Sequence, residues 1–154
     1  MLKQASIADL KDGLIERGDN HIVVTMRFYP RFLRKELRHE FICDLAPDRQ
    51  LLLDFNAARK RLQDHNSAFA AVNYEQRFRL NTVALAHLER LSKMSTTKDI
   101  YLACIYPVGE RCHREMLVLL SRELFGCRIG DVYHSYPVFM QRLQEFQHQP
   151  GSRT

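Results

Sequence analysis

The sequence predicts a single α/β domain built on a mainly parallel sheet with helices on its faces. Two apolar runs, residues 22–26 and 100–105, do not alternate with polar side chains. Continuous runs of this kind are typical of strands that are covered on both faces. Segments with helical spacing separate the two runs, which favours parallel strands joined by crossover helices. The 154 residues contain no internal repeat or interdomain linker, so we expect one domain over residues 1–146 and a flexible C-terminal tail over residues 147–154.

The first half of the chain is expected to form two strands and two helices. A short strand is expected at residues 3–7, and a Gly-Asp-Asn turn at residues 18–20 separates it from the first apolar run. Pro30 ends that region because proline cannot donate a backbone hydrogen bond to a ladder. Apolar residues at helical spacing then predict a helix that Pro47 closes, and a second helix is expected at residues 49–63. The apolar residues of the first of these helices are Leu33, Leu37, Phe41 and Leu45.

The second half is expected to follow the order helix, strand, helix, short strand, helix. A polar break separates the first helix from the strand, and a Pro/Gly loop joins that strand to the second helix. Gly126 is a suitable residue to end the second helix, because glycine readily adopts the left-handed conformation. The elements are expected at residues 74–92 (helix), 99–105 (strand), about 111–125 (helix), 132–133 (strand) and 138–146 (helix).

The ends of the two apolar runs carry the residues best suited to bind a ligand. Arg27, Pro30 and Arg31 follow the first run, and the sequence Tyr-Pro-Val-Gly-Glu-Arg-Cys-His-Arg, residues 106–114, follows the second. Sheets of parallel strands place their binding sites beyond the carboxyl ends of the strands. We therefore predict that the two strands are parallel neighbours and that both loops open onto one crevice.

The start of the helix near residue 111 favours an anion. Its first N–H groups lack intrahelical partners and carry partial positive charge. Arg111 and Arg114 add forked donors that suit phosphate, although arginines here also suit structural salt bridges. The same charges favour a thiolate at Cys112, and His113 is a candidate acid or base. Adjacent residues on a helix point about 100° apart, so His113 need not face the Cys112 sulfur. Cys112 therefore stays open as a nucleophile, a ligand contact or an inert thiol.

The cysteines form neither a metal-binding nor a disulfide pattern. Cys104, Cys112 and His113 are candidate metal ligands, but the spacing Cys-x7-Cys-His matches none of the usual zinc motifs, so we expect no metal. The chain also lacks a Walker phosphate loop and a glycine-rich dinucleotide turn, and no cofactor is expected. All cysteines are expected to be reduced thiols, with Cys112 the most reactive. They are Cys43, Cys104, Cys112 and Cys127.

The net charge of +5 introduces a second class of function. Basic residues gather around Arg34-Lys35-Arg38 and in Arg59-Lys60-Arg61. Such a surface binds nucleic acid through phosphate contacts, although a solvated basic face explains the same excess of charge. No segment approaches the ~18–20 apolar residues needed to cross a bilayer, and the N-terminus lacks the apolar core of a signal peptide. We expect a cytoplasmic protein without membrane contacts.

Three motifs that occur in a fixed order resemble a known family. They are the segments from Val24 to Arg31 and from Asp44 to Pro47, and Cys104 followed by Cys112-His113-Arg114. Together they resemble the prokaryotic domain-of-unknown-function family numbered four hundred and eighty-eight (DUF488). The resemblance covers roughly residues 3–125 and implies a small α/β domain with a Rossmann-like sheet and no established activity. The matched site positions are Arg27, Pro30, Arg31, Cys104, Cys112, His113 and Arg114.

Two positions depart from the pattern of that family. Phe32 stands where a glycine often follows the Pro-Arg pair, and Ile105 stands where an acidic residue often follows the first cysteine. The second departure weakens any mechanism that needs a carboxylate at the end of the strand. Glu110 or a more distant acid would have to replace it.

The sequence thus favours a cytosolic domain that binds a phosphorylated or nucleotide-like anion at the strand ends, with hydrolase or transferase chemistry as a further step. The expected ligand-binding residues are Arg27, Pro30, Arg31, Cys104, Arg111 and Arg114, and the expected catalytic residues are Cys112 and His113. The alternative is a non-enzymatic nucleic-acid-binding protein that uses the two basic segments. Binding through many phosphates falls steeply with salt, whereas binding of one or two phosphates in a pocket is less sensitive.

Overall fold

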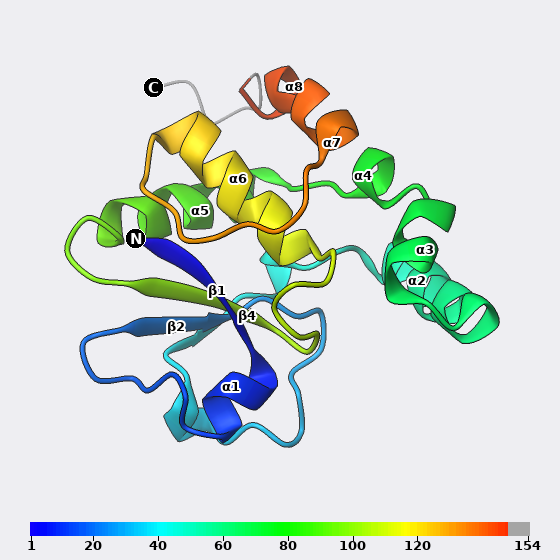
Figure 1. Ribbon diagram of the computed structural model, residues 1–154. Helices are drawn as coiled ribbons and strands as arrows, with labels where there is room; N and C mark the ends of the chain where they lie inside the picture. The colour runs from blue at the N-terminus through cyan, green and yellow to red at the C-terminus, as the bar shows by residue number, and fades with distance from the viewer. Residues whose placement is uncertain (148–154) are drawn as a thin grey trace.

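The computed structural model describes residues 1–147 and contains one four-stranded sheet with helices on both faces (Figure 1). Its strand order is β1-β4-β2-β3, and every pair of neighbours is parallel. The strands are β1 (Leu2–Ser6), β2 (His21–Val24), β3 (Glu40–Phe41) and β4 (Ile100–Cys104). The predicted fold class, a Rossmann-like α/β domain with a parallel sheet, is confirmed. Of the expected tail, Gln147 ends the last helix and residues 148–154 lie outside the described residues.

The helices are distributed unevenly along the chain, and most follow the third strand. The α-helices are α1 (Ile7–Lys11), α2 (Arg49–Leu62), α3 (His65–Ala71), α4 (Tyr74–Arg77), α5 (Thr82–Met94), α6 (His113–Phe125), α7 (Pro137–Gln141) and α8 (Leu143–Gln147). Two short 3-10 helices, η1 (Lys35–Leu37) and η2 (Cys43–Leu45), lie on either side of β3.

Alternate side chains of the central strands enter two separate cores. On one face, Val23 and Leu102 belong to the larger core that α5 and α6 cover. On the other face, Val24 and Ala103 belong to a smaller core that α1 and Leu33 complete. Figure 1 shows α5 and α6 on one side of the sheet and α1 on the other. Burial on both faces explains why these strands are continuously apolar in the sequence.

The neighbouring strands β2 and β4 lead into connections on opposite faces of the sheet. Val24 pairs with Ala103, so the two strands are parallel neighbours, as predicted. The chain after β2 packs through Met26 and Leu33 into the smaller core, whereas the chain after β4 enters α6 and the larger core. A crevice opens where two adjacent parallel strands diverge in this way, beyond their carboxyl ends.

The predicted helix with apolar positions from Leu33 to Leu45 is wrong. The segment instead contains η1, β3 and η2. Phe41 pairs with Val24 at the edge of the sheet, and the amide of Ile42 donates to the carbonyl of Val24. Without this segment β2 would be an unpaired edge, so tertiary strand pairing overrides a helical spacing of the apolar residues.

The predicted helices at 74–92 and 138–146 are each divided in two, and residues 132–133 form no strand. Asn81 interrupts the first, because its side chain accepts from the amide of Ala84 and caps α5. Asp64 caps α3 in the same way, through the amide of Ser67, and that helix was not anticipated. The helices predicted at 49–63 and 111–125 correspond to α2 and α6.

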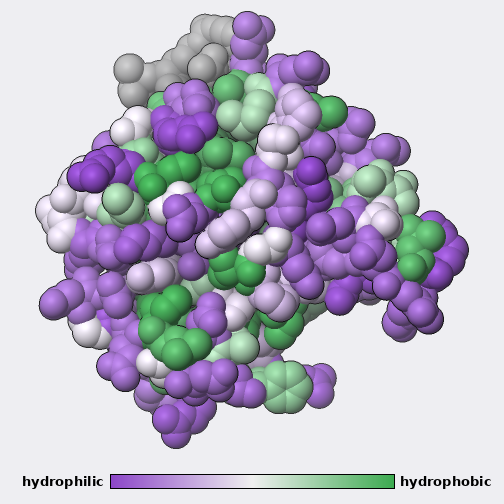
Figure 2. All heavy atoms as spheres, viewed as in Figure 1, coloured by the Kyte–Doolittle hydropathy of each residue, from purple (hydrophilic) through white to green (hydrophobic). Residues whose placement is uncertain are grey.

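Across the described residues, no helix is both long enough and apolar enough to span a membrane. Figure 2 shows that, on the face viewed in Figure 1, hydrophobic side chains lie in separate patches among hydrophilic ones. The larger exposed hydrophobic side chains include Phe28, Phe32 and Tyr133. Of these, Phe28 lies beside the carboxyl ends of the strands, at the site described next.

Candidate functional site

A cavity of about 470 Å³ lies beyond the carboxyl ends of β2 and β4. Both predicted loops contribute to it, which confirms that they open onto one crevice. The loop after β2 supplies Met26, Arg27 and Phe28, and helix α2 supplies a wall on the opposite side. Residues that line the cavity include Met26, Arg27, Phe28, Phe55, Arg59, Tyr74, Cys104, Tyr106, Glu110 and His113. Most of the wall is aromatic or aliphatic, with a few polar groups, as is usual for ligand pockets.

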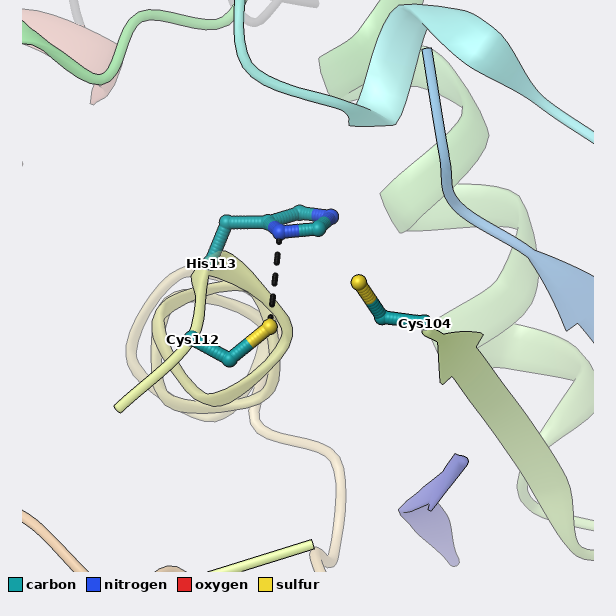
Figure 3. Close-up of side chains that lie close together, drawn as sticks. All are labelled: Cys104, Cys112 and His113. Atoms are coloured by element: carbon teal, nitrogen blue, oxygen red, sulfur yellow. Dashed lines mark hydrogen bonds between the residues drawn. The ribbon is translucent and has the colours of Figure 1, made fainter. Parts of the chain in front are cut away.

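Cys112 and His113 face each other at the start of α6 (Figure 3). Cys112 is the N-cap residue and has an extended backbone, with φ −156° and ψ 150°. The 100° separation of helical neighbours therefore does not apply between it and His113. The sulfur of Cys112 lies 3.5 Å from Nδ1 of His113. The two residues thus form a thiol–imidazole pair, although they are adjacent in sequence.

The environment of His113 fixes which ring nitrogen carries a proton. Nε2 lies 2.7 Å from the carbonyl oxygen of Thr25 and 3.3 Å from its hydroxyl. A carbonyl can only accept, so Nε2 donates, and in the neutral ring Nδ1 is then the acceptor. The Thr25 hydroxyl donates in turn to the carbonyl of Ala103 in β4. The imidazole is therefore oriented to accept the proton of the Cys112 thiol.

Cys104 brings a second sulfur to the same point from the last position of β4 (Figure 3). The two sulfurs and a ring nitrogen of His113 all lie within 4.8 Å of one another. Burial alone would raise the pKa of Cys112, but the hydrogen bond from Cys104, the imidazole and the Arg114 guanidinium hold it well below its usual range. The pKa of Cys104 is well above its usual range, because its thiol donates to Cys112 and is buried. Of the two thiols, Cys112 is therefore the one that loses its proton more readily.

Arg114 is a buried structural residue. Its side chain is 0% exposed, and its guanidinium donates to the backbone carbonyls of Ala5, Tyr106 and Pro107. These contacts tie the end of β1 to the loop after β4. Arg114, expected among the ligand-binding residues, does not line the cavity. Its described hydrogen-bond acceptors are all backbone carbonyls, and its positive charge contributes to the lowered pKa of Cys112.

The other predicted ligand-binding residues divide into two groups. Arg27 lines the cavity, and its Nε and Nη2 donate to the carbonyls of Pro47 and Ala46. Arg31 is exposed and Pro30 is buried, and neither lines the cavity. Arg111 turns away, because its guanidinium donates to the carbonyl of Ser135 and stacks over the ring of Tyr136. Of the predicted set, the cavity therefore brings together Arg27, Cys104 and His113.

Arg59 is a cavity residue that the sequence indicated only as part of a basic segment. Its guanidinium lies 4.8 Å from the centre of the Tyr106 ring and 5.9 Å from that of Phe55. Burial raises the pKa of Tyr106 to about 12, so this ring stays neutral beneath the cation. Glu110, the acidic residue of the cavity wall, lies 3.1 Å from Nδ1 of His65. The two arginines therefore give the cavity its positive character.

A second buried polar cluster, unanticipated from the sequence, supports the other side of the first turn of α6. Glu115 is 0% exposed and accepts from the Tyr136 hydroxyl, the amide of Tyr133 and the side chain of Gln4. His134 also contacts this carboxylate, at 2.9 Å. The Tyr136 hydroxyl accepts in turn from the amide of Cys112, which fixes the N-cap position. We call this group the Glu115 cluster.

The parallel sheet and the site at its carboxyl edge define an α/β domain with a dithiol–imidazole group beside a positively charged, aromatic cavity. A family model described as the active DUF488-N3 subclade matches residues 6–124. The chain therefore belongs to the DUF488 family, and the predicted resemblance is confirmed. The matched region includes both strand ends and most of α6. Neither the curated proteins nor the solved structures gave a match to this sequence.

Proposed function

We propose that the cavity binds a phosphorylated, nucleotide-like ligand and that the dithiol–imidazole group acts on it by hydrolysis or group transfer. One observation carries the proposal: a single cavity combines two arginines, an aromatic wall and a buried thiol–imidazole pair. The arginines would bind the anion, the aromatic wall would contact a planar apolar group, and the thiol–imidazole pair would carry out the reaction. The description of the matching subclade as active supports an enzyme.

Arg27 and Arg59 supply the anion-binding part. In the guanidinium of Arg27, Nε donates to the carbonyl of Pro47 and Nη2 donates to the carbonyl of Ala46. These hydrogen bonds fix the orientation of the group, and its remaining N–H groups are available to a ligand. Arg59 is held over the Tyr106 ring, and its stacked, planar fork suits phosphate oxygens. A cation that is already oriented loses less entropy when it binds an anion.

The aromatic side chains supply a surface for a planar group. Phe28 is 62% exposed, an unusual position for a large apolar side chain, and it lines the cavity. Phe55 and Tyr106 meet edge to face on the opposite wall, with ring centroids 5.9 Å apart. Stacking on aromatic side chains contributes about 1–3 kcal/mol per nucleic-acid base. A nucleobase between these walls would bury Phe28 and bring an attached phosphate toward the arginines.

The chemistry would come from the inner wall of the cavity. His113 and Cys104 line it directly, and Cys112 lies behind them in contact with both. His113 accepts the thiol proton of Cys112 and gives it to the leaving group, while the resulting thiolate, the candidate nucleophile, attacks the ligand and the bond to the leaving group breaks. Water, or an acceptor in group transfer, then cleaves the new bond between sulfur and the ligand and restores the thiol. The four free cysteines also support our proposal that the protein functions in the reducing cytoplasm.

A thermal-shift series tests this proposal against the nucleic-acid alternative. The protein is heated with inorganic phosphate, nucleoside mono- and diphosphates, and a single-stranded oligonucleotide. A ligand present at one hundred times its Kd would raise Tm by about 5–10 °C. Arg59→Ala should remove most of this shift. Arg61→Ala is the matched control, because Arg61 is exposed on the same helix and does not line the cavity.

Two outcomes would contradict the proposal. One is the absence of a shift with every phosphorylated compound. The other is a shift that only the oligonucleotide produces, that collapses with added salt and that Arg59→Ala and Arg61→Ala reduce equally. The second result would favour binding of nucleic acid to the basic face of α2.

A further inference from the structure

Three side chains at the inner wall of the cavity present donor atoms of the kind that bind zinc. Cys104 and Cys112 offer thiol sulfurs, and His113 offers an imidazole nitrogen, all within 4.8 Å of one another (Figure 3). We infer that these three residues form a binding site for a soft divalent cation of the zinc class, with its fourth coordination position open to the cavity. The site goes beyond the proposed function, because binding of the metal does not require the phosphorylated ligand. It is an alternative state of the same three residues, since a metal would occupy the sulfur and nitrogen atoms that serve as nucleophile and base in the metal-free protein.

The observed separation of two of the donors matches tetrahedral coordination. Zinc–sulfur bonds of about 2.3 Å and zinc–nitrogen bonds of about 2.0 Å place the sulfur and nitrogen about 3.5 Å apart in a tetrahedron. The sulfur of Cys112 lies 3.5 Å from Nδ1 of His113. The sulfur of Cys104 lies within 4.8 Å of the sulfur of Cys112, so it has to move by about 1 Å or less to reach the corresponding sulfur–sulfur distance.

The far side of the His113 ring provides an independent observation. Imidazoles that bind a metal almost always donate their second ring N–H to a carbonyl or carboxylate, which directs the other nitrogen at the metal. Nε2 of His113 donates to the carbonyl of Thr25 at 2.7 Å. Nδ1 therefore has its lone pair toward the sulfur of Cys112. This is the orientation that a metal ligand needs, and the surrounding chain imposes it without a metal.

The open coordination position follows from which ligands reach the cavity. Cys104 and His113 line it, whereas Cys112 lies behind them. Sites with three protein ligands and one free position are typical of zinc that contacts a substrate or water, whereas structural zinc has four protein ligands. The spacing of these three residues does not match the usual zinc motifs, because Cys104 ends a strand whereas Cys112 and His113 begin the next helix.

Metal binding and thiol alkylation should exclude each other, because both use the same sulfur lone pairs. This competition provides a readout that does not depend on activity. The full chain, freed of metal with a chelator, is titrated with Co²⁺, which gives thiolate charge-transfer absorption in the near ultraviolet and intense visible bands when tetrahedral. We expect saturation at one equivalent, loss of the bands on addition of Zn²⁺, and protection of Cys104 and Cys112 from iodoacetamide.

Variants identify the ligands. Cys104→Ser, Cys112→Ser and His113→Gln should each weaken Co²⁺ binding by at least about tenfold, since even residues that only support a ligand have effects of that size. Cys43→Ser and Cys127→Ser are the matched controls and should bind normally. Melting curves of the metal-free variants show that each is folded before it is titrated.

The inference is overturned if the wild type gives no charge-transfer band, or if the band is equally strong in Cys104→Ser and Cys112→Ser. Neither result would affect the proposed function, which is measured by phosphate-dependent stabilisation of metal-free protein. Conversely, a normal cobalt spectrum without any anion-dependent shift would retain the metal site and reject the phosphorylated ligand.

Discussion

The two sides of the first turn of α6 differ in what lies beside their buried polar groups. On one side, Glu115 is fully buried and has contacts from Gln4, Tyr133, His134 and Tyr136. On the other side, Cys112 contacts His113, and His113 borders a cavity that the chain leaves unfilled. A buried polar group enclosed by protein stabilises the fold, whereas one that reaches a cavity is available to a ligand.

The two sides are linked through one hydroxyl group. Tyr136 donates to Glu115 and accepts from the amide of Cys112. The Glu115 cluster therefore holds the N-cap in the extended conformation that lets Cys112 face His113. Tyr133, His134 and Tyr136 follow the region that the family model matches, residues 6–124. The site thus depends on a segment of the chain beyond the region that the family model matches.

The largest effect is expected from Glu115→Ala. Removal of this carboxylate leaves buried donors from Tyr136, Gln4 and the amide of Tyr133 without an acceptor, and we expect a loss of about 3–5 kcal/mol in the free energy of unfolding. Urea denaturation measures it. Glu123→Ala, on an exposed position of the same helix, should change stability by no more than about 0.5 kcal/mol. Equal effects of the two variants would show that the Glu115 cluster does not stabilise the fold.

The second largest effect is expected from Arg114→Ala, which should lower the free energy of unfolding by about 3 kcal/mol. Three carbonyls lose a charged donor, and removal of the buried side chain leaves a void. Arg122→Ala, exposed near the end of the same helix, is the control. A ligand-binding role for Arg114 predicts the reverse, namely normal stability without ligand and loss of the anion-dependent shift. That result would contradict the structural assignment.

Tyr136→Phe isolates the link between the two sides. The substitution preserves the ring in the core but removes the hydroxyl between Glu115 and the amide of Cys112. We expect a loss of about 1–2 kcal/mol, because one buried acceptor and one buried donor lose their partner. If the cluster fixes the N-cap, the variant should also alkylate more rapidly at Cys112. A destabilised variant with unchanged alkylation would separate the fold from the site.

The sequence predicts well those elements whose pattern arises from local burial. The strands β2 and β4 are continuously apolar because both faces are covered. The helices α2 and α6 have a helical spacing of apolar residues, and Gly126 marks the end of α6. The segment from Leu33 to Leu45 fails for the opposite reason. Its apolar spacing fits a helix, but pairing of Phe41 with the edge of β2 decides its conformation. No local pattern records such a long-range pairing.

In the candidate site, too, some features can be predicted from the sequence and others depend on tertiary contacts. The neighbouring strand ends, and with them Arg27, Cys104 and His113 at one cavity, follow from parallel topology. The assignment of Arg114 required the structure, since an arginine at a helix start suits a phosphate or a set of carbonyls equally well in sequence. The contact between Cys112 and His113 depends on the extended backbone of the N-cap. In that conformation the two side chains are not separated by the 100° that holds for neighbours within a helix. The sequence identifies Arg59 as part of a basic segment, but it does not predict that its guanidinium lies over the ring of Tyr106.

The smallest effect on stability is expected from His113→Gln, which tests the thiol–imidazole pair alone. Glutamine can place an amide N–H near the Thr25 carbonyl, so stability should change by about 1 kcal/mol or less. It has no acceptor equivalent to the ring nitrogen that faces Cys112. In the metal-free wild type, the lowered pKa of Cys112 predicts an alkylation rate that falls less steeply with decreasing pH than that of a thiol with a pKa near 8.5, which slows about tenfold per pH unit below neutrality.

In His113→Gln that pH dependence should steepen toward the tenfold value, because the thiolate loses the imidazole that stabilises it. The slope of the rate against pH is the informative quantity, since burial of Cys112 lowers its absolute rate in both proteins. The rate at Cys43, measured in the same digest, corrects for the reagent and for any general loosening of the fold. An unchanged slope at Cys112 would mean that Cys104 and Arg114 suffice to hold the charge, and it would remove His113 from the proposed acid–base role.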